Sequence, residues 1–331
     1  MGSLLAVDGN SLAHRAWHAL KSEGLDGAWV THGVVRMLAT AWRHGPFDGV
    51  VVAFDSPRSL RRARDPAYKA NRGAHDPALH EQLSLLADLL ARCGCTVLTA
   101  AGYEADDLLA ATAHACTDLA VRCHLLSSDR DLLALVSPTV TLLRPRRTMA
   151  DMTVHDPAAV ETEFGIAPAK YLHLAALRGD PSDNLPGVRG IGTRTAARLL
   201  RSWGSIEGIY AGLFDIPPAV AARLRAGRQQ VERNLALMTP QADHDVDVPG
   251  VLARGVDVER VCRTLEAVGL GAAAASFRHA VARGPLPPLP PPPEVDPTDH
   301  GRPARHATTR SGSRTPVAVE GEQAALFDLA G

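Results

Sequence analysis

The chain has 331 residues and a formal net charge of −1 at pH 7, with 46% hydrophobic and 21% charged residues. This composition is typical of globular proteins and excludes a wholly disordered or fibrous chain. No run of 18 apolar residues occurs, so no membrane span is expected. Met1–Asn10 lacks a basic start and contains Asp8 in its apolar stretch, which argues against a signal peptide. Five cysteines in no zinc-ligand spacing indicate reduced thiols, so we expect a soluble cytoplasmic protein.

Short apolar runs alternate with helical patterns in the first half of the chain. Buried strands are expected at 4–7, 50–54, 96–98, 124–126 and 140–143. Apolar residues at helical spacing lie between them, at 11–20, 32–44, 77–92, 103–119 and 131–136. This alternation predicts an α/β domain over residues 1–167, with a parallel sheet wrapped by helices on both faces.

The composition changes twice in the second half. From about Pro168 no convincing strand pattern occurs, and Arg-rich helical patterns continue to residue 283, so we expect a helical domain over 168–283. Eight of the 24 prolines lie between Pro285 and Pro297, and polar residues follow. Such a segment buries too little apolar surface to offset its ordering entropy, which predicts a disordered linker over 284–319. Apolar residues return in the short segment 320–331.

Acidic residues gather where the predicted strands end. Seven of them follow the strands directly or after a short loop: Asp8, Asp55, Glu104, Asp106, Asp107, Asp129 and Asp131. The carboxyl ends of parallel strands meet at one edge of a sheet, so these side chains are expected to share a crevice. At about 4 Å, two carboxylates repel by roughly 4 kcal/mol at an effective dielectric near 20. Oxygen ligands without His or Cys favour Mg²⁺ or Mn²⁺ over zinc as the compensating ion.

Each acidic group also has a simpler interpretation when it is taken alone. The acids at 104–107 could oppose the dipole of a helix that begins there. Those at 129–131 could form a turn and an N-cap. Neither interpretation explains why all the groups fall at the same edge of the sheet, so the metal site is the favoured hypothesis.

Basic residues are also segregated along the chain. Six lie between Arg58 and Arg72, and five arginines lie between Arg178 and Arg201. Such segregation is typical of proteins that bind a polyanion, although solvated helix faces would explain it on charge alone. A Gly-rich turn into a helix would let backbone N–H groups approach a phosphate, with a simple helix connector as the alternative. The residues concerned are Gly187, Arg189, Gly190, Gly192, Thr193 and Arg194.

Six separated motifs stand in a characteristic order. They are Asp8, Phe54-Asp55, Tyr68-Lys69-Ala-Asn-Arg72, Glu104-Ala-Asp-Asp107, Asp129-Arg-Asp131 and the segment Gly179–Gly192. In this order they resemble the 5′-nuclease (flap endonuclease) family, which includes the 5′-3′ exonuclease domain of bacterial DNA polymerase I. The resemblance covers about residues 4–280, and no polymerase region follows, so the chain resembles a free-standing member. It departs at Arg130, where the family usually has Lys, and at Leu60-Arg61-Arg62, where Phe-Arg-His is usual.

The resemblance implies a PIN-like nuclease domain followed by a helix-hairpin-helix DNA-binding motif. It adds Asp180 and Asp183 to the acidic set, so that all nine family positions are occupied. It further implies two or more Mg²⁺ (or Mn²⁺) ions, the first held by the acids of 8–107 and the second by those of 129–183. A K⁺ ion in the hairpin is a further expectation.

The segment 56–76 would form a mobile arch over the site. The resemblance implies that Lys69 and Arg72 reach the scissile phosphate and that Tyr68 stacks on a frayed base. Arg58, Arg61 and Arg62 would contact DNA from the same arch.

The implied activity is hydrolysis near the 5′ ends of flapped, forked or nicked duplex DNA, by a monomer acting at the nucleoid in replication (RNA-primer removal) or repair. Two other hypotheses remain. A PIN-type ribonuclease shares the carboxylate-edged sheet, but the helical domain argues against it. A non-catalytic binder of branched DNA is disfavoured by the complete acidic set.

The last residues carry a further motif. Gln323, Leu326 and Phe327 resemble the Gln-x-x-Leu-Phe peptide by which bacterial replication proteins bind the sliding clamp. A flexible linker of about 36 residues would span roughly 30–36 Å, enough to separate docking from cleavage. The alternative is that the segment packs as a last helical turn on the helical domain.

Overall fold

The computed structural model describes residues 2–20, 29–72, 76–146 and 151–284, all within one compact unit. Apart from Gly284, the predicted linker and the clamp-binding peptide lie outside these residues. The domain boundary expected at 167/168 stays a prediction. No helix in the described ranges is long and apolar enough to cross a membrane.

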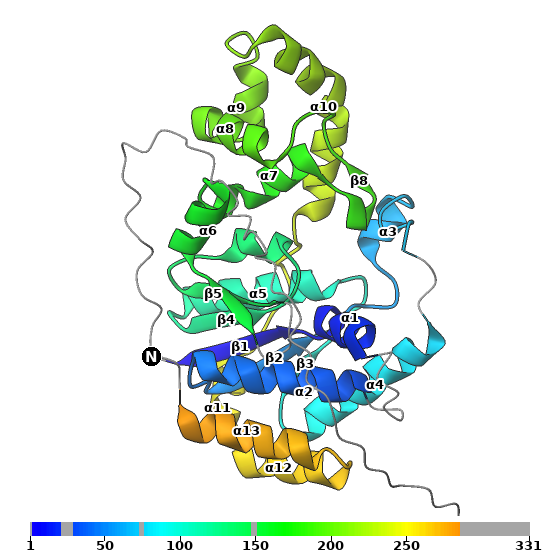
Figure 1. Ribbon diagram of the computed structural model, residues 1–331, viewed down its shortest axis with the longest axis vertical. Coiled ribbons are helices and arrows are strands. Elements are labelled where there is room, and N and C mark those ends of the chain that lie inside the picture. The colour runs from blue at the N-terminus through cyan, green and yellow to red at the C-terminus, as the bar shows by residue number, and fades with distance from the viewer. Residues whose placement is uncertain (1, 21–28, 73–75, 147–150, 285–331) are drawn as a thin grey trace, which may run out of the picture. The chain divides into compact units, whose positions relative to one another are not determined.

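A six-stranded sheet forms the centre of the first half, in the order β3-β2-β1-β4-β5-β6 (Figure 1). The strands are β1 Ser3–Asp8, β2 Gly49–Ala53, β3 Thr96–Leu98, β4 Arg122–Leu126, β5 Val140–Pro145 and β6 Met152–His155. β1 to β5 pair in parallel, as predicted, and β6 adds an antiparallel edge strand that was not predicted. The sequence Met-Thr-Val-His of β6 is too short and too mixed to give a strand pattern.

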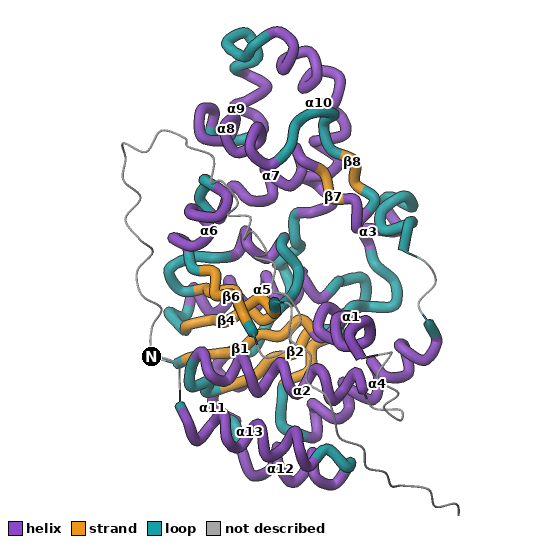
Figure 2. The backbone as a smooth tube through the Cα atoms, in the orientation of Figure 1, coloured by secondary structure: helices purple, strands orange, loops and turns teal. Residues whose placement is uncertain are grey.

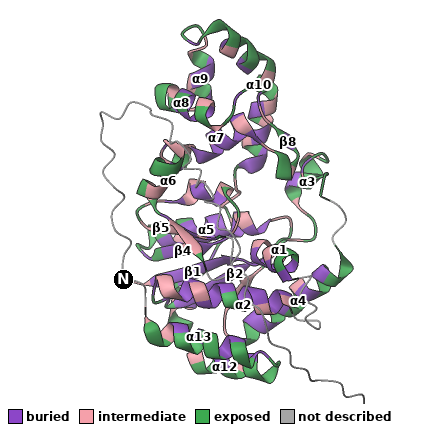
Figure 3. Cartoon of the chain, viewed as in Figure 1, coloured by how far each residue is buried: buried purple, intermediate pink, exposed green. Residues whose placement is uncertain are grey.

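The central strands are buried on both faces, which is why they appear in the sequence as continuous apolar runs (Figure 3). Side chains of β1 alternate between two hydrophobic clusters: Leu4 and Ala6 contribute to one, Leu5 and Val7 to the other. Helix α5 packs in the first cluster, whereas α1, α2 and α4 pack in the second. The predicted two-sided α/β arrangement is confirmed (Figure 2).

The helices of the first half agree with the predicted patterns. They are α1 Gly9–Leu20, α2 Trp29–Ala41, α4 Pro77–Arg92, α5 Ala105–Asp118 and the 3-10 turn Asp131–Leu135. A short helix α3, Leu60–Arg64, lies in the expected arch and is capped by Ser59, whose hydroxyl accepts from the backbone N–H of Arg62. The helix α6, Pro157–Phe164, leads into the helical half.

Four α-helices and the 3-10 turn Pro168–Lys170 follow in the next part of the described chain. The helices are α7 Tyr171–Arg178, α8 Thr193–Trp203, α9 Ile206–Ala211 and α10 Pro218–Met238. The expectation that this part has no strand is wrong in one place. Between α7 and α8, β7 (Gly179–Asp180) pairs with β8 (Leu185–Pro186) around the turn Pro181–Asp183. Strands of two residues are too short to leave a period in the sequence.

The last helices return to the sheet domain. They are α11 Val248–Arg254, α12 Val258–Ala267 and α13 Gly271–Arg283. Cys262, Leu265 and Phe277 share a hydrophobic cluster with α2 and α4. The ring of Phe277 meets that of Trp42 at a centroid distance of 5.0 Å. The residues expected to form one helical domain therefore include a group of helices that packs against the α/β core.

Candidate active site

A single cleft of about 1320 Å³ lies at the carboxyl edge of the sheet. Seven of the nine acidic positions line it: Asp8, Asp55, Glu104, Asp106, Asp129, Asp180 and Asp183. The first five come from the ends of β1, β2 and β4 and the start of α5, and the last two come from the β7–β8 hairpin. The topology therefore brings together carboxylates that are up to 175 residues apart in the chain.

Asp8 is a deeply buried acid of the cleft, with 6% of its surface exposed. It accepts hydrogen bonds from the Ser11 backbone N–H (2.9 Å) and the Ser127 hydroxyl (2.7 Å). Burial raises the pKa of Asp8 to about 7 in spite of these bonds, and the charges of Asp55 and Asp129 add to the rise. The ionised form of Asp8 is therefore costly unless a cation is near.

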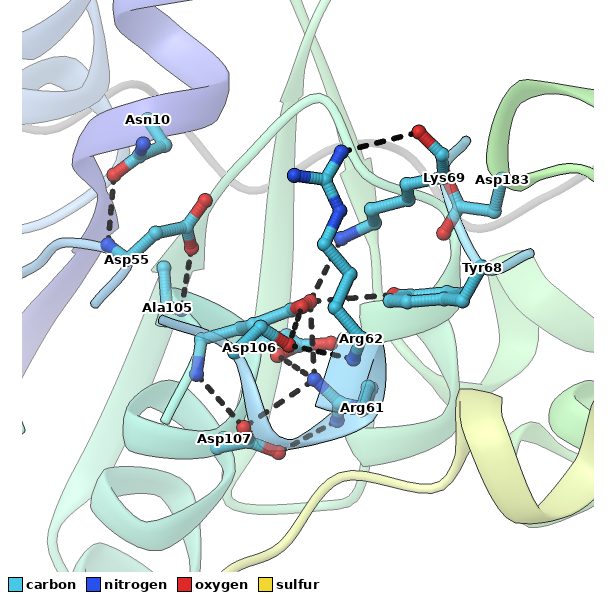
Figure 4. Close-up of polar contacts among 12 residues, drawn as sticks. Asn10, Asp55, Arg61, Arg62, Tyr68, Lys69, Ala105, Asp106, Asp107 and Asp183 are labelled. Atoms are coloured by element: carbon cyan, nitrogen blue, oxygen red, sulfur yellow. Dashed lines mark hydrogen bonds and ion pairs between the residues drawn. The ribbon is translucent and has the colours of Figure 1, made fainter. Parts of the chain in front are cut away.

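Asp55 joins the end of β2 to the start of α5. Its backbone N–H donates to Asn10 Oδ1 (2.9 Å), and its Oδ1 accepts from the Ala105 N–H (2.8 Å) (Figure 4). Its side chain is open to solvent in the cleft mouth, but the surrounding walls desolvate it and raise its pKa. Burial between protein walls, together with neighbouring acids, also raises the pKa values of Asp129 and Asp131.

The side chains of the cleft acids have the ligand type that a divalent cation such as Mg²⁺ prefers. All donors are carboxylate oxygens, and their repulsion and desolvation favour a compensating positive charge. Among the described residues, no three His, Cys, Asp or Glu side chains are gathered as a ready coordination group. Mg²⁺ keeps several waters and commonly binds through one or two carboxylates, so the spread acids remain suitable ligands.

Glu104 already has partners from the arch. Its Oε2 accepts from Lys69 Nζ (2.7 Å), Arg61 (3.1 Å) and the Tyr68 hydroxyl (3.2 Å), while Ser59 donates to Oε1. Burial alone would raise the pKa of Glu104, but Lys69 and Arg61 together hold it at about 2. Glu104 is therefore an ionised anchor for the arch.

The structure does not place Asp107 among the residues that line the cleft, contrary to its expected metal role. Its Oδ2 accepts from the Glu104 backbone N–H (2.9 Å) and closes a capping box at the start of α5. Its Oδ1 accepts from Arg61 (2.6 Å, Figure 4). The same oxygen accepts from the Gln241 N–H (2.7 Å), which fixes the chain after α10. Asp131 does not line the cleft either; it begins a 3-10 turn beside Asp129, and desolvation together with the charges of Asp129, Asp180 and Asp183 raises its pKa.

Arg61 lies in a different place from the one expected of a DNA-contacting arginine. Only 4% of its surface is exposed, and its guanidinium pairs with three carboxylates, Glu104, Asp106 and Asp107. Arg58 and Arg62 are exposed on the arch, as DNA contact requires. Tyr68 is also buried (3%), so in this arrangement its ring is not open to stack on a base.

Lys69 and Arg72 do line the cleft, opposite the sheet-edge acids. Lys69 adopts a left-handed backbone conformation, with φ of 55°, and its Nζ reaches Glu104. Arg72 pairs with Asp183 of the hairpin. Ion pairs thus hold these two cations in the cleft.

The β7–β8 hairpin depends on two glycines. A Cβ on Gly187 would lie 2.1 Å from the Arg178 carbonyl oxygen, and one on Gly179 would lie 2.2 Å from the Gly187 nitrogen. Only glycine permits this close pass, which presents Asp180 and Asp183 to the cleft.

The Gly-rich turn leads from this hairpin into α8. Gly192 is the N-cap of α8 and offers no side-chain cap, and Thr193 lines the cleft. Arg189, Gly190 and Arg194 are exposed beside it. The backbone N–H groups of the first helical turn are therefore free of a side-chain cap, as the phosphate-binding hypothesis requires.

Sequence reasoning missed several residues that line or support the cleft. His14, Arg15 and His18 line it from α1. His14 and His18 are four residues apart on the helix that follows Asp8, a spacing that places them on one face. Ser127 and Asn10, which hold Asp8 and Asp55, carry no signal that distinguishes them from ordinary loop residues.

Two family models match adjoining parts of the chain. The 5′-3′ exonuclease N-terminal resolvase-like domain matches residues 3–165, and the 5′-3′ exonuclease C-terminal SAM fold matches residues 166–255.

Similar curated proteins are bacterial DNA polymerases. The chain is 39% identical to DNA polymerase I of Mycobacterium leprae over 240 residues, which cover 71% of this chain and 26% of that protein. It is 34% identical to the thermostable DNA polymerase I of Thermus thermophilus over 300 residues, 88% of this chain and 35% of that one. The chain thus spans about a quarter to a third of the length of these relatives.

Solved structures share the fold. The T5 D15 protein co-crystallised with metal ions superposes with a TM-score of 0.59 at 21% identity, covering 84% of this chain and 99% of that one. The catalytic core of Rad2 in complex with DNA substrate gives 0.54 at 15% identity, covering 85% and 91%.

Proposed function

Because the chain belongs to the 5′-3′ exonuclease family, we propose that it is a structure-specific nuclease that hydrolyses phosphodiester bonds near 5′ ends of branched or nicked duplex DNA. The observation that carries this proposal is the cleft in which sheet-edge carboxylates face Lys69 and Arg72. Acids on one wall can hold divalent cations, and cations on the other can hold a phosphate. A phosphodiesterase needs both.

We propose Asp8, Asp55, Asp106, Asp129, Asp180 and Asp183 as the cation-binding acids, with Mg²⁺ or Mn²⁺ as the ion. When bound, such ions activate a water molecule and neutralise the leaving oxygen. Glu104 and Asp107 act differently, by holding Lys69 and Arg61. We propose that Lys69 and Arg72 orient the scissile phosphate and offset the charge that develops on it.

Duplex binding is assigned to the turn 187–192 and the start of α8. Backbone N–H groups at this helix N-terminus, with Arg189 and Arg194, suit the phosphates of a duplex. A K⁺ ion bound by carbonyl groups of the same turn is a further part of the proposal. Arg58 and Arg62 would contact the 5′ strand from the arch.

The test uses 5′-end-labelled flap, nick, gap and blunt duplex substrates, run side by side in Mg²⁺, Mn²⁺ and EDTA. We expect cleavage near the 5′ end of branched or nicked DNA with either metal and none in EDTA. A matched pair of variants sharpens the test. Asp106→Asn alters the cleft, whereas Asp118→Asn alters an exposed acid at the other end of α5 and should cleave like wild type. Cleavage of RNA hairpins in preference to DNA, or binding without product, would contradict the proposal.

We further propose that Gln323, Leu326 and Phe327, outside the described residues, bind the sliding clamp. Leu326 and Phe327 could fill an apolar pocket, with Gln323 as the polar contact. Tethering would raise the effective concentration of the nuclease at nicks left by a polymerase. Deleting 321–331 should abolish clamp binding in a pull-down with purified clamp, without altering the melting temperature or the cleavage of free oligonucleotides. If the deletion lowers the melting temperature by several degrees and the intact chain does not bind the clamp, the segment has a structural role instead.

A further inference from the structure

Two asparagines join the arch to the β7–β8 hairpin by reciprocal hydrogen bonds. Asn71 Nδ2 donates to the Pro181 carbonyl oxygen (2.7 Å), and Asn184 Nδ2 donates to the Ala67 carbonyl oxygen (2.8 Å). Each segment thus gives a side-chain amide to the backbone of the other, across more than 100 residues of sequence. We call this pair of bonds the asparagine clasp.

The backbone at the clasp adopts an uncommon conformation on both sides. Lys69 has φ of 55° and Asn184 has φ of 58°, in the left-handed region that few non-glycine residues occupy. The Lys69 N–H donates to the Asp183 carbonyl oxygen (2.9 Å) between the two amide bonds. Since left-handed lysine is unfavourable in isolation, contacts with the hairpin must hold it.

The clasp determines where the cleft cations point. Lys69 lies between Ala67 and Asn71, and its Nζ reaches Glu104. Arg72 follows Asn71 directly and pairs with Asp183. Neither Asn71 nor Asn184 lines the cleft. Inside the cleft, their effect therefore acts through the neighbouring Lys69, Arg72 and Asp183.

We infer that Asn71 and Asn184 are positioning residues that hold Lys69 and Arg72 over the acidic cleft for phosphodiester cleavage. The inference rests on the proposed function and adds to it two side chains that need not touch substrate or metal. The clasp adds two side-chain bonds to the Lys69 backbone bond and the Arg72–Asp183 ion pair, which also join the arch to the hairpin.

Other contacts retain the arch when the clasp is removed. Arg61 is buried against Glu104, Asp106 and Asp107, and Asp65 pairs with Arg233 of α10. Both clasp asparagines are exposed. Loss of the clasp should therefore leave the fold intact and disturb only the placement of Lys69 and Arg72.

The experiment compares wild type with Asn71→Ala, Asn184→Gly and the double variant. Glycine at 184 keeps the left-handed backbone accessible and removes only the amide. Gln229→Ala is the control, because it deletes an exposed side-chain amide on α10. On a 5′-flap substrate in Mg²⁺, we expect the single-turnover rate to fall about tenfold in each single variant and about 100-fold in the double variant. KM should stay within about threefold and the melting temperature within about 2 °C. The control should match wild type.

Limited trypsin digestion without DNA or metal provides a readout that needs no activity. The arch offers exposed cleavage sites at Arg58, Arg62 and Arg64. We expect the double variant to be cut there several times faster than wild type, whereas Gln229→Ala is not.

Three results would overturn the inference: an unchanged rate in the double variant, a rise in KM with an unchanged rate, or a loss of several degrees in melting temperature. An unchanged rate would show that the clasp has no effect on cleavage. A rise in KM alone would show that the amides contact DNA, and a lower melting temperature would show that they stabilise the fold. A wild-type chain without 5′-end cleavage would refute the proposed function instead, so the two failures are distinct.

Discussion

The two walls of the cleft are built in different ways. The acidic wall is placed by the sheet, because Asp8 ends β1 and pairs in register with Ala53 of β2, two residues before Asp55. The basic wall is placed by polar contacts of the arch with Glu104, Arg233 and the hairpin, all distant in sequence. Backbone topology therefore determines the positions of the sheet-edge acids, whereas side-chain contacts determine the positions of Lys69 and Arg72.

The two walls also differ in electrostatic balance. Burial and mutual repulsion raise the pKa values of Asp8, Asp55 and Asp129, so the acidic wall is strained without a cation. Glu104 is instead satisfied by Lys69 and Arg61, and its pKa falls to about 2. The acidic wall, which we propose as the cation-binding site, is thus destabilising on its own, whereas the arch contacts contribute stability. The variants below break one wall at a time.

Breaking the acidic wall should have the largest effect. Asp8→Asn removes a buried charge that faces Asp55 and Asp129 while it keeps the size of the side chain. We expect single-turnover cleavage of a 5′ flap to fall by at least about 10³-fold, since charge at the reacting phosphate is then uncompensated. The melting temperature in EDTA should rise by a few degrees because repulsion is relieved. DNA affinity within about tenfold of wild type provides the control, and wild-type cleavage by this variant would contradict the assignment.

Removing Arg61, which joins the arch to the acids of α5, should mainly lower the free energy of unfolding. Arg61→Met leaves Glu104, Asp106 and Asp107 without their shared cation, at a cost of about 3 kcal/mol in the free energy of unfolding. Arg62→Met, on the exposed side of the same helix, should change it by less than about 0.5 kcal/mol. Urea unfolding of both variants checks the difference. Equal midpoints would show that the buried ion pairs contribute nothing.

Asp107 tests the distinction between the acids that line the cleft and the acids that hold Arg61. Asp107→Asn weakens the capping box and the bond to Arg61, so unfolding should be easier by about 1–2 kcal/mol. Its effect on cleavage should be much smaller than that of Asp8→Asn, since Asp107 does not line the cleft. Single-turnover kinetics and thermal melts of the two variants test this. A loss of cleavage as complete as in Asp8→Asn, with an unchanged melt, would return Asp107 to the metal-binding acids.

The smallest expected effect concerns His124 of β4, which does not line the cleft. Burial lowers the pKa of His124 to about 4, with Arg122 and His44 adding to the fall. The folded state therefore binds fewer protons than the unfolded state below about pH 6.5, and stability is lost as the pH falls through that range. Relative to His124→Gln, wild type should lose about 1 kcal/mol in the free energy of unfolding between pH 7 and pH 5.5. Urea unfolding at each pH measures this difference. The same pH dependence of the free energy of unfolding in both proteins would contradict the prediction.

The contrast between the walls also explains what the sequence predicts. Apolar runs and strand–helix alternation predict β1 to β5, and the ends of parallel strands bring Asp8, Asp55 and Asp129 together without knowledge of any side-chain contact. The burial of Arg61, the contact of Asp107 with Gln241 and the clasp at Asn71 could not be predicted, because each depends on a partner 43 to 134 residues away. In the sequence Arg61 looks no different from Arg62, and only packing distinguishes them.

The most direct test of the account is a double-mutant cycle across the cleft, between Asp8→Asn and Lys69→Met. The measured quantity is the single-turnover rate of 5′-flap cleavage in Mg²⁺ at saturating enzyme. If the two walls act on one phosphate, their effects are not additive, and the double variant should be less than about tenfold slower than the slower single variant. Fully additive losses would show that Asp8 and Lys69 act independently, and they would contradict a single site shared by the two walls.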